Sequence, residues 1–191
     1  MKIKNIVILI VLNFLFLGVY AQKENAEIMR YPSEWKFERI SFPLDFAKDI
    51  TWKGYEELRF SPGMFKAESE QYFTYYFGMK IEDKITITKE EIQDMLMKYY
   101  KGLCKAVNSN GKFAINYEKI KAIVTKIDLN NYKANITFFD SFTNGKEVDL
   151  LMLITTKKDK KNLLVLASVV PSVKESKLSV LHQKNLKENL R

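Results

Sequence analysis

The chain has 191 residues, of which 47% are hydrophobic and 28% are charged, and its formal net charge at pH 7 is +8. A single cysteine excludes an intramolecular disulfide, and a single histidine argues against zinc sites, which need several His or Cys ligands. The excess positive charge lies in residues 101–191, where Arg191 is the only arginine. Because base and phosphate recognition favours the arginine fork, we expect no nucleic-acid partner.

Residues 1–21 have the pattern of a secretory signal peptide. Lys2 and Lys4 precede an apolar run that is shorter than the roughly 20 residues of a membrane-spanning helix. Cleavage after Ala21 is therefore predicted over retention as a membrane anchor. Gln22 would be the new N-terminus, which excludes a lipid-modified cysteine there. The prediction is a periplasmic or secreted protein without a transmembrane anchor, in which residues 22–191 form one domain.

Three strands are predicted in the first half of this domain. Residues 35–42 mix aromatic and charged side chains and stop at Pro43, as edge strands do. After an irregular connection, residues 55–60 form a short strand that ends at the turn of Ser61, Pro62 and Gly63. Residues 71–81 are predicted to be the longest strand, with its core side chains at every second position. These core side chains are Phe73, Tyr75, Phe77, Met79 and Ile81.

A long amphipathic helix is predicted over residues 89–107. Thr88 and Glu91 form a capping box, in which both side chains accept hydrogen bonds from backbone donors at the start of the helix. Apolar side chains recur behind it at helical spacing, at Ile92, Leu96, Tyr99, Leu103 and Val107. Cys104 lies beside this stripe, so we expect a buried and inert thiol.

Four further strands are predicted, at residues 122–128, 132–139, 148–156 and 163–170. Short polar turns between them indicate an antiparallel meander, and the last two are apolar on both faces, which places them centrally. Leucines near the C-terminus predict a final helix. The expected fold is a single α+β domain: a curved antiparallel sheet of six to seven strands, the long helix packed on its concave face, and a C-terminal helix.

No motif in the sequence dictates a reaction, so no catalytic residue, metal site or cofactor is predicted. Carboxylates are plentiful, but neighbouring residues of a strand point to opposite faces, so Glu56 and Glu57 cannot act together. Glu56, Glu68 and Glu70 are interpreted as solvated surface charges. His182, on the final helix, is expected to be partly exposed.

One face of the first hairpin is the best candidate for a binding surface. A strand period of two puts Tyr55, Glu57 and Arg59 on one face, and the same period groups Tyr72, Thr74 and Tyr76. A few polar groups among aromatic rings are typical of ligand clefts. The alternative is a structural pair of Glu57 and Arg59 beneath packed tyrosines.

Three short motifs carry a resemblance to a known family. The segments FPLDFA, GYEELRFSPGMF and FFDSFT resemble the pattern of an uncharacterised family of exported bacterial proteins. The likeness spans roughly residues 35–155 and implies export and a single domain, without an activity, cofactor or partner. It adds Asp140 to the candidate binding residues, because Asp140 lies within one of the motifs.

The sequence therefore predicts an exported, non-enzymatic binding or interaction protein. Its partner would be a small molecule or an envelope protein of unknown identity. Two alternatives remain. One is an enzyme of unknown class that uses Glu57 and Asp140, and the other is an envelope assembly protein that contacts anionic surfaces through its basic second half.

Overall fold

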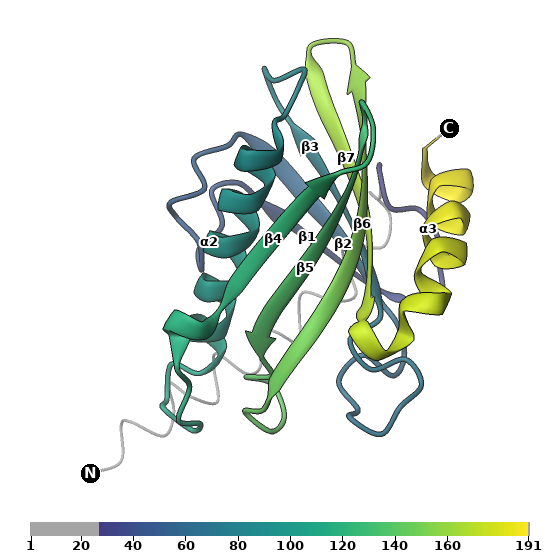
Figure 1. Cartoon of the computed structure of the whole chain (residues 1–191). Helices are drawn as coiled ribbons and strands as arrows, with labels where there is room; N and C mark the ends of the chain where they lie inside the picture. The colour runs from purple at the N-terminus through teal and green to yellow at the C-terminus, as the bar shows by residue number, and fades with distance from the viewer. Residues whose placement is uncertain (1–26, 191) are drawn as a thin grey trace.

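The computed structural model describes residues 27–190, which form an open seven-stranded antiparallel sheet with helices on both faces (Figure 1). The strands lie in the order β1-β2-β3-β7-β6-β5-β4. The predicted α+β class is confirmed, and the sheet does not close into a barrel. The predicted signal peptide lies outside the described residues.

The sheet is built from two groups of strands that meet at β7. The first group is β1 (Lys36–Ser41), β2 (Gly54–Phe60) and β3 (Tyr75–Ile81). The second is the predicted meander of β4 (Lys121–Lys126), β5 (Asn131–Phe139), β6 (Glu147–Asp159) and β7 (Asn162–Pro171). Because β7 pairs with β3, the two apolar strands β6 and β7 lie centrally, as predicted from their apolar faces.

Helix α2 (Lys89–Val107) covers one face of the sheet, over β4 and β5. Its capping box forms as predicted: the Thr88 hydroxyl accepts from the Glu91 amide at 3.1 Å, and the Glu91 carboxylate accepts from the Thr88 amide at 2.8 Å. Cys104 is buried, as expected. The buried stripe of α2 is rotated from the predicted one, because Leu103 and Val107 are only partly buried. It consists of Ile92, Met95, Leu96, Tyr99, Tyr100 and Cys104.

Helix α3 (Glu175–Asn189) covers the opposite face, over β7 and β6. Its buried side chains are Leu178, His182 and Asn185, so the expectation of a partly exposed His182 was wrong. The imidazole lies between the hydroxyls of Ser168 and Thr155, 3.0 Å from each. We call the face under α3 the outer face.

The strand predicted from residue 71 begins only at Tyr75 and has 7 residues, so the prediction that it is the longest was wrong. The longest described strand is β6, with 13 residues. Phe73 has a φ of 45°, and the Thr74 amide donates to the Gln71 carbonyl, so residues 71–74 form a turn. The predicted core side chains from Phe73 to Ile81 are nevertheless all buried in the cluster beneath α2. Within residues 27–190, no helix is long and apolar enough to cross a membrane.

Candidate functional site

Strand β2 is covered on both faces and carries two adjacent buried carboxyl groups. Glu56 and Glu57 are both 0% exposed, and they point to opposite faces, as strand geometry requires. Glu56 shares its face with Leu58 and lies towards α2, while Glu57 lies on the outer face. The interpretation of Glu56 as a solvated surface charge was therefore wrong, whereas Glu68 and Glu70 are exposed.

The Glu57 carboxylate holds the N-terminal segment, which we define as residues 27–35, against the outer face. It accepts hydrogen bonds from the backbone amides of Glu27, Ile28 and Met29 at 3.0, 2.9 and 2.7 Å. It also forms an ion pair with Arg39, which stands directly opposite it on β1 and donates from Nε at 2.9 Å. Both carboxylate oxygens are thus in use.

Arg59 holds the same segment from its other side. Its guanidinium donates to the carbonyls of Met29, Trp35 and Arg30 at 2.8, 3.1 and 3.2 Å. It also lies 4.6 Å from the centroid of the Phe37 ring, at cation–π distance. Among the described contacts, Arg59 therefore donates hydrogen bonds to backbone carbonyl groups, and the ion pair of Glu57 is formed with Arg39.

The predicted grouping of candidate residues holds for some of them and not for others. Tyr55 and Tyr76 share the outer face with Glu57 and Arg59, and the Tyr76 hydroxyl donates to the Leu181 carbonyl of α3 at 3.1 Å. Tyr72 lies elsewhere, because the turn at Phe73 interrupts the strand alternation. Its ring packs against the cluster beneath α2. Thr74 is buried beside this turn, where its hydroxyl lies 3.5 Å from the Tyr72 carbonyl.

Asp140 orders the loop that follows β5. Its carboxylate accepts from the Tyr72 hydroxyl at 2.7 Å and from the amides of Phe142 and Thr143 at 3.0 Å each. Burial and the bond to this carboxylate raise the pKa of the Tyr72 hydroxyl. Glu57 lies on β2 and Asp140 follows β5, and three strands separate β2 from β5 in the sheet, so the structure does not bring together the two carboxylates of the enzyme alternative.

The polar group that the sequence reasoning missed lies on the α2 side of β2. The Glu56 carboxyl accepts one hydrogen bond, from the Tyr99 hydroxyl of α2 at 3.3 Å, and its second oxygen is buried without a partner. The hydroxyls of Tyr75 and Tyr100 form a short hydrogen bond in the same core. Burial raises the pKa of the Glu56 carboxyl to about 8, so the group is protonated at neutral pH.

Residues 42–53, which connect β1 to β2 and which we call the strap, cover this group. Leu44, Ala47 and Ile50 anchor the strap in the core, and the Phe46 ring packs edge-on against Tyr99 with centroids 5.0 Å apart. The strap comes so close to α2 that a Cβ atom at Gly102 would lie 2.0 Å from the Phe46 carbonyl oxygen. Glu56 is therefore closed off from solvent in this conformation.

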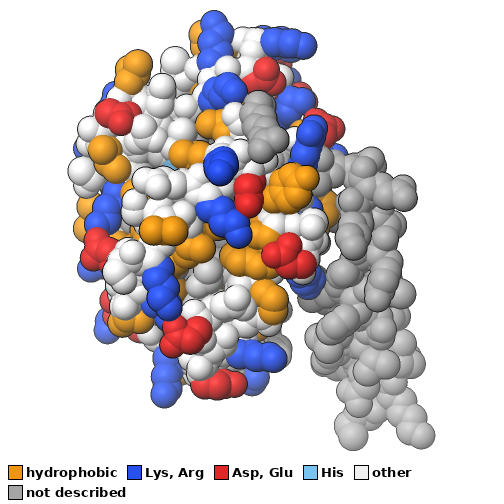
Figure 2. Space-filling view, turned by 90° about the vertical axis from the view of Figure 1, so that its right-hand side faces the viewer, with side chains coloured by type: hydrophobic (Ala, Val, Ile, Leu, Met, Phe, Trp, Pro, Cys, Tyr) orange, Lys and Arg blue, Asp and Glu red, His pale blue; other side chains and the backbone are white. Residues whose placement is uncertain are grey.

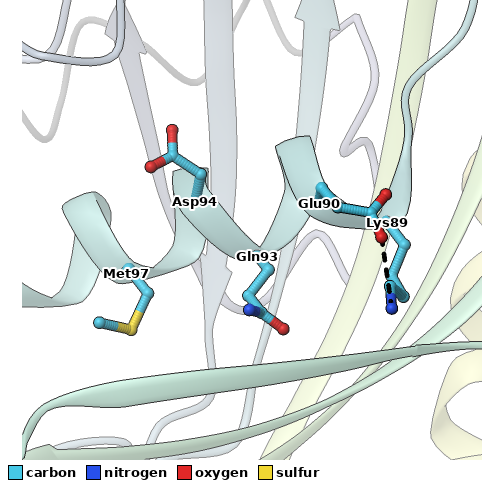
Figure 3. A pocket seen from close by; sticks show the side chains of 5 residues that line it. All are labelled: Lys89, Glu90, Gln93, Asp94 and Met97. Atoms are coloured by element: carbon cyan, nitrogen blue, oxygen red, sulfur yellow. Dashed lines mark ion pairs between the residues drawn. The ribbon is translucent and has the colours of Figure 1, made fainter.

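A shallow hollow of about 340 Å³ lies between α2 and the edge strand β4 (Figure 3). Gln93 and Met97 point from the helix towards the strand, whereas Asp94 points away from it. The Gln93 carbonyl accepts from the Val124 amide at 3.1 Å, and the Met97 sulfur accepts from the Ala122 amide at 2.9 Å. These side chains satisfy the free edge of β4, so we interpret the hollow as edge protection.

In residues 27–190, no group of three or more His, Cys, Asp or Glu side chains could hold a metal ion. Comparison with known proteins found no family model and no curated protein that matches this chain.

Proposed function

We propose that the protein is an exported, non-enzymatic binding protein, and that its binding site lies around Glu56 beneath the strap. Export is supported by the signal-peptide pattern of residues 1–21. The binding role is supported by one observation, the buried Glu56 oxygen without a partner. Such atoms are rare in folded proteins, because an unpaired buried polar group costs about 1–3 kcal/mol.

The outer face supports a binding role less well. Glu57 and Arg59 are engaged by the chain's own backbone, and α3 and the N-terminal segment cover Tyr76. A ligand there would have to displace buried hydrogen bonds. At Glu56, by contrast, a ligand would supply a hydrogen bond that the folded chain lacks.

The chemistry around Glu56 indicates which ligands would fit. The unpaired oxygen can accept a hydrogen bond from a primary amine or a hydroxyl, and tyrosine rings and aliphatic side chains surround it. An amine would bind as the ammonium ion and would ionise Glu56, so its affinity would rise as the pH approaches 8. A neutral hydroxyl compound would bind the protonated carboxyl, so its affinity would fall above pH 8.

A screen with small primary amines and neutral polyols tests this proposal. We expect a hit to raise the melting temperature of the wild-type protein and to leave that of Glu56→Gln unchanged. Gly102→Ala should weaken binding or alter its rate, because the new methyl group displaces the strap. Equal stabilisation of wild type and Glu56→Gln by the same compound would contradict the site.

Export is tested separately by intact-mass measurement of the protein from the envelope or culture fraction. We expect a chain that begins at Gln22. A product that retains residues 1–21 would contradict the cleavage prediction without bearing on the Glu56 site.

A further inference from the structure

Three loops come together at one end of the sheet, at the top of Figure 1. They are residues 82–88 between β3 and α2, residues 127–130 between β4 and β5, and the tip of the β6–β7 hairpin, residues 157–161, in which β6 ends at Asp159. The strand register places them there, because Ile81 pairs with Leu163 and Asn131 pairs with Thr155. We call these three loops the loop end.

The loop end exposes aliphatic side chains. Leu129 is 77% exposed, Ile127 is 57% exposed and Ile85 is 46% exposed. Single exposed aliphatic residues are normal on a protein surface, but here three occur in adjacent loops. None of the three loops contains an aromatic residue.

The loop that carries Ile127 and Leu129 has a defined conformation. The Asp128 carboxylate accepts from the amides of Asn130 and Asn131 at 2.9 and 3.0 Å, and the Ile127 amide donates to the Asn131 carbonyl at 2.8 Å. The turn therefore presents its two aliphatic side chains on a fixed backbone. Hydrogen bonds from Asn131 and Asn130 lower the pKa of Asp128, so this exposed carboxylate stays ionised.

Lysines surround these aliphatic side chains. Residues 157–161 read Lys-Lys-Asp-Lys-Lys, and all four lysines are exposed. Lys126 adds another exposed cation at the base of the neighbouring loop. Figure 2 shows Lys and Arg side chains gathered at this upper end. Acidic residues are present too: Asp83 is paired with Lys161 at 3.1 Å, and the other carboxylates of the three loops are Glu82, Asp128 and Asp159.

We propose that the loop end docks on an anionic membrane surface, with Ile127 and Leu129 entering the interface and the lysines of residues 157–161 facing the lipid head groups. Exposed aliphatic side chains favour the boundary between head groups and acyl chains, and the lysines beside them are attracted to the negatively charged head groups. A nucleic acid fits less well, because the loops offer neither an arginine nor an aromatic side chain for base stacking. This proposal does not depend on a ligand at Glu56.

Sedimentation with lipid vesicles tests the proposal. The protein is purified from the expressing cells without a further cleavage step. Intact-mass measurement identifies its first residue and checks that every variant begins at the same residue. We expect binding to vesicles of phosphatidylcholine with 30% phosphatidylglycerol, roughly tenfold weaker binding to pure phosphatidylcholine, and a loss of binding as salt rises.

Two double variants and two matched controls locate the contact. Ile127→Ser with Leu129→Ser, and Lys158→Gln with Lys160→Gln, should each weaken binding to anionic vesicles by about tenfold. Val173→Ser with Val180→Ser changes aliphatic residues that are 88% and 70% exposed elsewhere, and Lys48→Gln with Lys66→Gln changes lysines exposed outside the loop end. Both controls should bind like wild type, and unchanged melting temperatures would show that all four variants are folded.

Several outcomes would overturn the docking proposal. It is overturned if wild type binds neither vesicle or binds both equally. It is also overturned if the loop-end variants retain full binding, or if the control variants lose as much binding as the loop-end variants. Equal binding to a short DNA duplex at the same salt concentration would replace the membrane with a nucleic acid.

Discussion

Glu56 and Glu57 are neighbours in one strand and are equally buried, yet their surroundings differ completely. On the outer face, Glu57 accepts from three backbone amides and from the Arg39 guanidinium. On the α2 face, Glu56 accepts from one tyrosine and leaves an oxygen unpaired. Burial alone therefore does not decide how a carboxyl group behaves, because the number and charge of its donors do. The first arrangement is a structural clamp, and the second leaves a buried carboxyl oxygen without a donor among the described residues.

The largest expected effect breaks the clamp. Glu57→Ala should lower the free energy of unfolding by about 5 kcal/mol, because it removes the buried carboxylate closest to the Arg39 guanidinium and leaves the buried amides of Ile28 and Met29 without their acceptor. Chemical denaturation measures this loss. Glu27→Ala is the matched control. The Glu27 carboxylate also pairs with the Arg39 guanidinium, at 3.7 Å, but it is exposed. A loss no larger than that of Glu27→Ala would mean that the N-terminal segment does not depend on Glu57.

The next effect concerns the unpaired group on the α2 face. The pKa of Glu56 is about 8 in the folded protein, above its ordinary value of 4.5, so the folded state holds this proton more tightly than the unfolded state. The resulting stability is present at low pH and is lost as the pH rises from about 4.5 through 8. The loss should reach about 4 kcal/mol at pH 8.5.

Glu56→Gln should remove this part of the pH dependence, because the amide does not titrate. Denaturant unfolding of both proteins at pH 5 and pH 8.5 measures this effect. The free energy of unfolding of Glu56→Gln, relative to that of wild type, should be higher at pH 8.5 than at pH 5. If the difference between the two proteins were the same at both pH values, Glu56 would not titrate in this range.

His182 gives the outer face the opposite pH dependence. Burial lowers its pKa from 6.5 to about 4, so the unfolded state takes up the proton first as the pH falls. Stability linked to His182 is therefore present above pH 6.5 and is lost between 6.5 and 4, by about 3 kcal/mol. His182→Gln should flatten the unfolding free energy in this window. A wild-type slope that survives the substitution would assign the acid sensitivity to other groups.

Local geometry explains which parts of this comparison the sequence could predict. The period of two in β2 correctly separated Glu56 from Glu57, and the capping box correctly placed the start of α2. Glu56 shares parity with Leu58 and Phe60, which was a signal of burial, but a glutamate in an alternating strand ordinarily faces water. The cover on both faces of β2 comes from residues distant in sequence, so alternation alone could not reveal it.

Longer-range pairing explains the rest. Arg39 meets Glu57 only because β1 and β2 pair in one register across the strap, and no local pattern fixes that register. Tyr72 left the predicted face because one residue, Phe73, adopts a positive φ. His182 lies one helical turn after Leu178, which was a signal of burial, but the face that α3 covers depends on the whole sheet.

The smallest effect sharpens the comparison between the two helices. The N-cap of α2 makes both bonds of a capping box, whereas the N-cap of α3, Lys174, makes no side-chain cap and the helix relies instead on its buried His182 and Asn185. Thr88→Ala should therefore cost about 1 kcal/mol, because the Glu91 amide loses its acceptor while no core contact changes. Thr88→Ser, which keeps the hydroxyl, is the matched control and should stay close to wild type in chemical denaturation. If both substitutions cost the same, the methyl group of Thr88 would matter more than its hydroxyl, and α2 would be held, like α3, by its packing on the sheet and not by its cap.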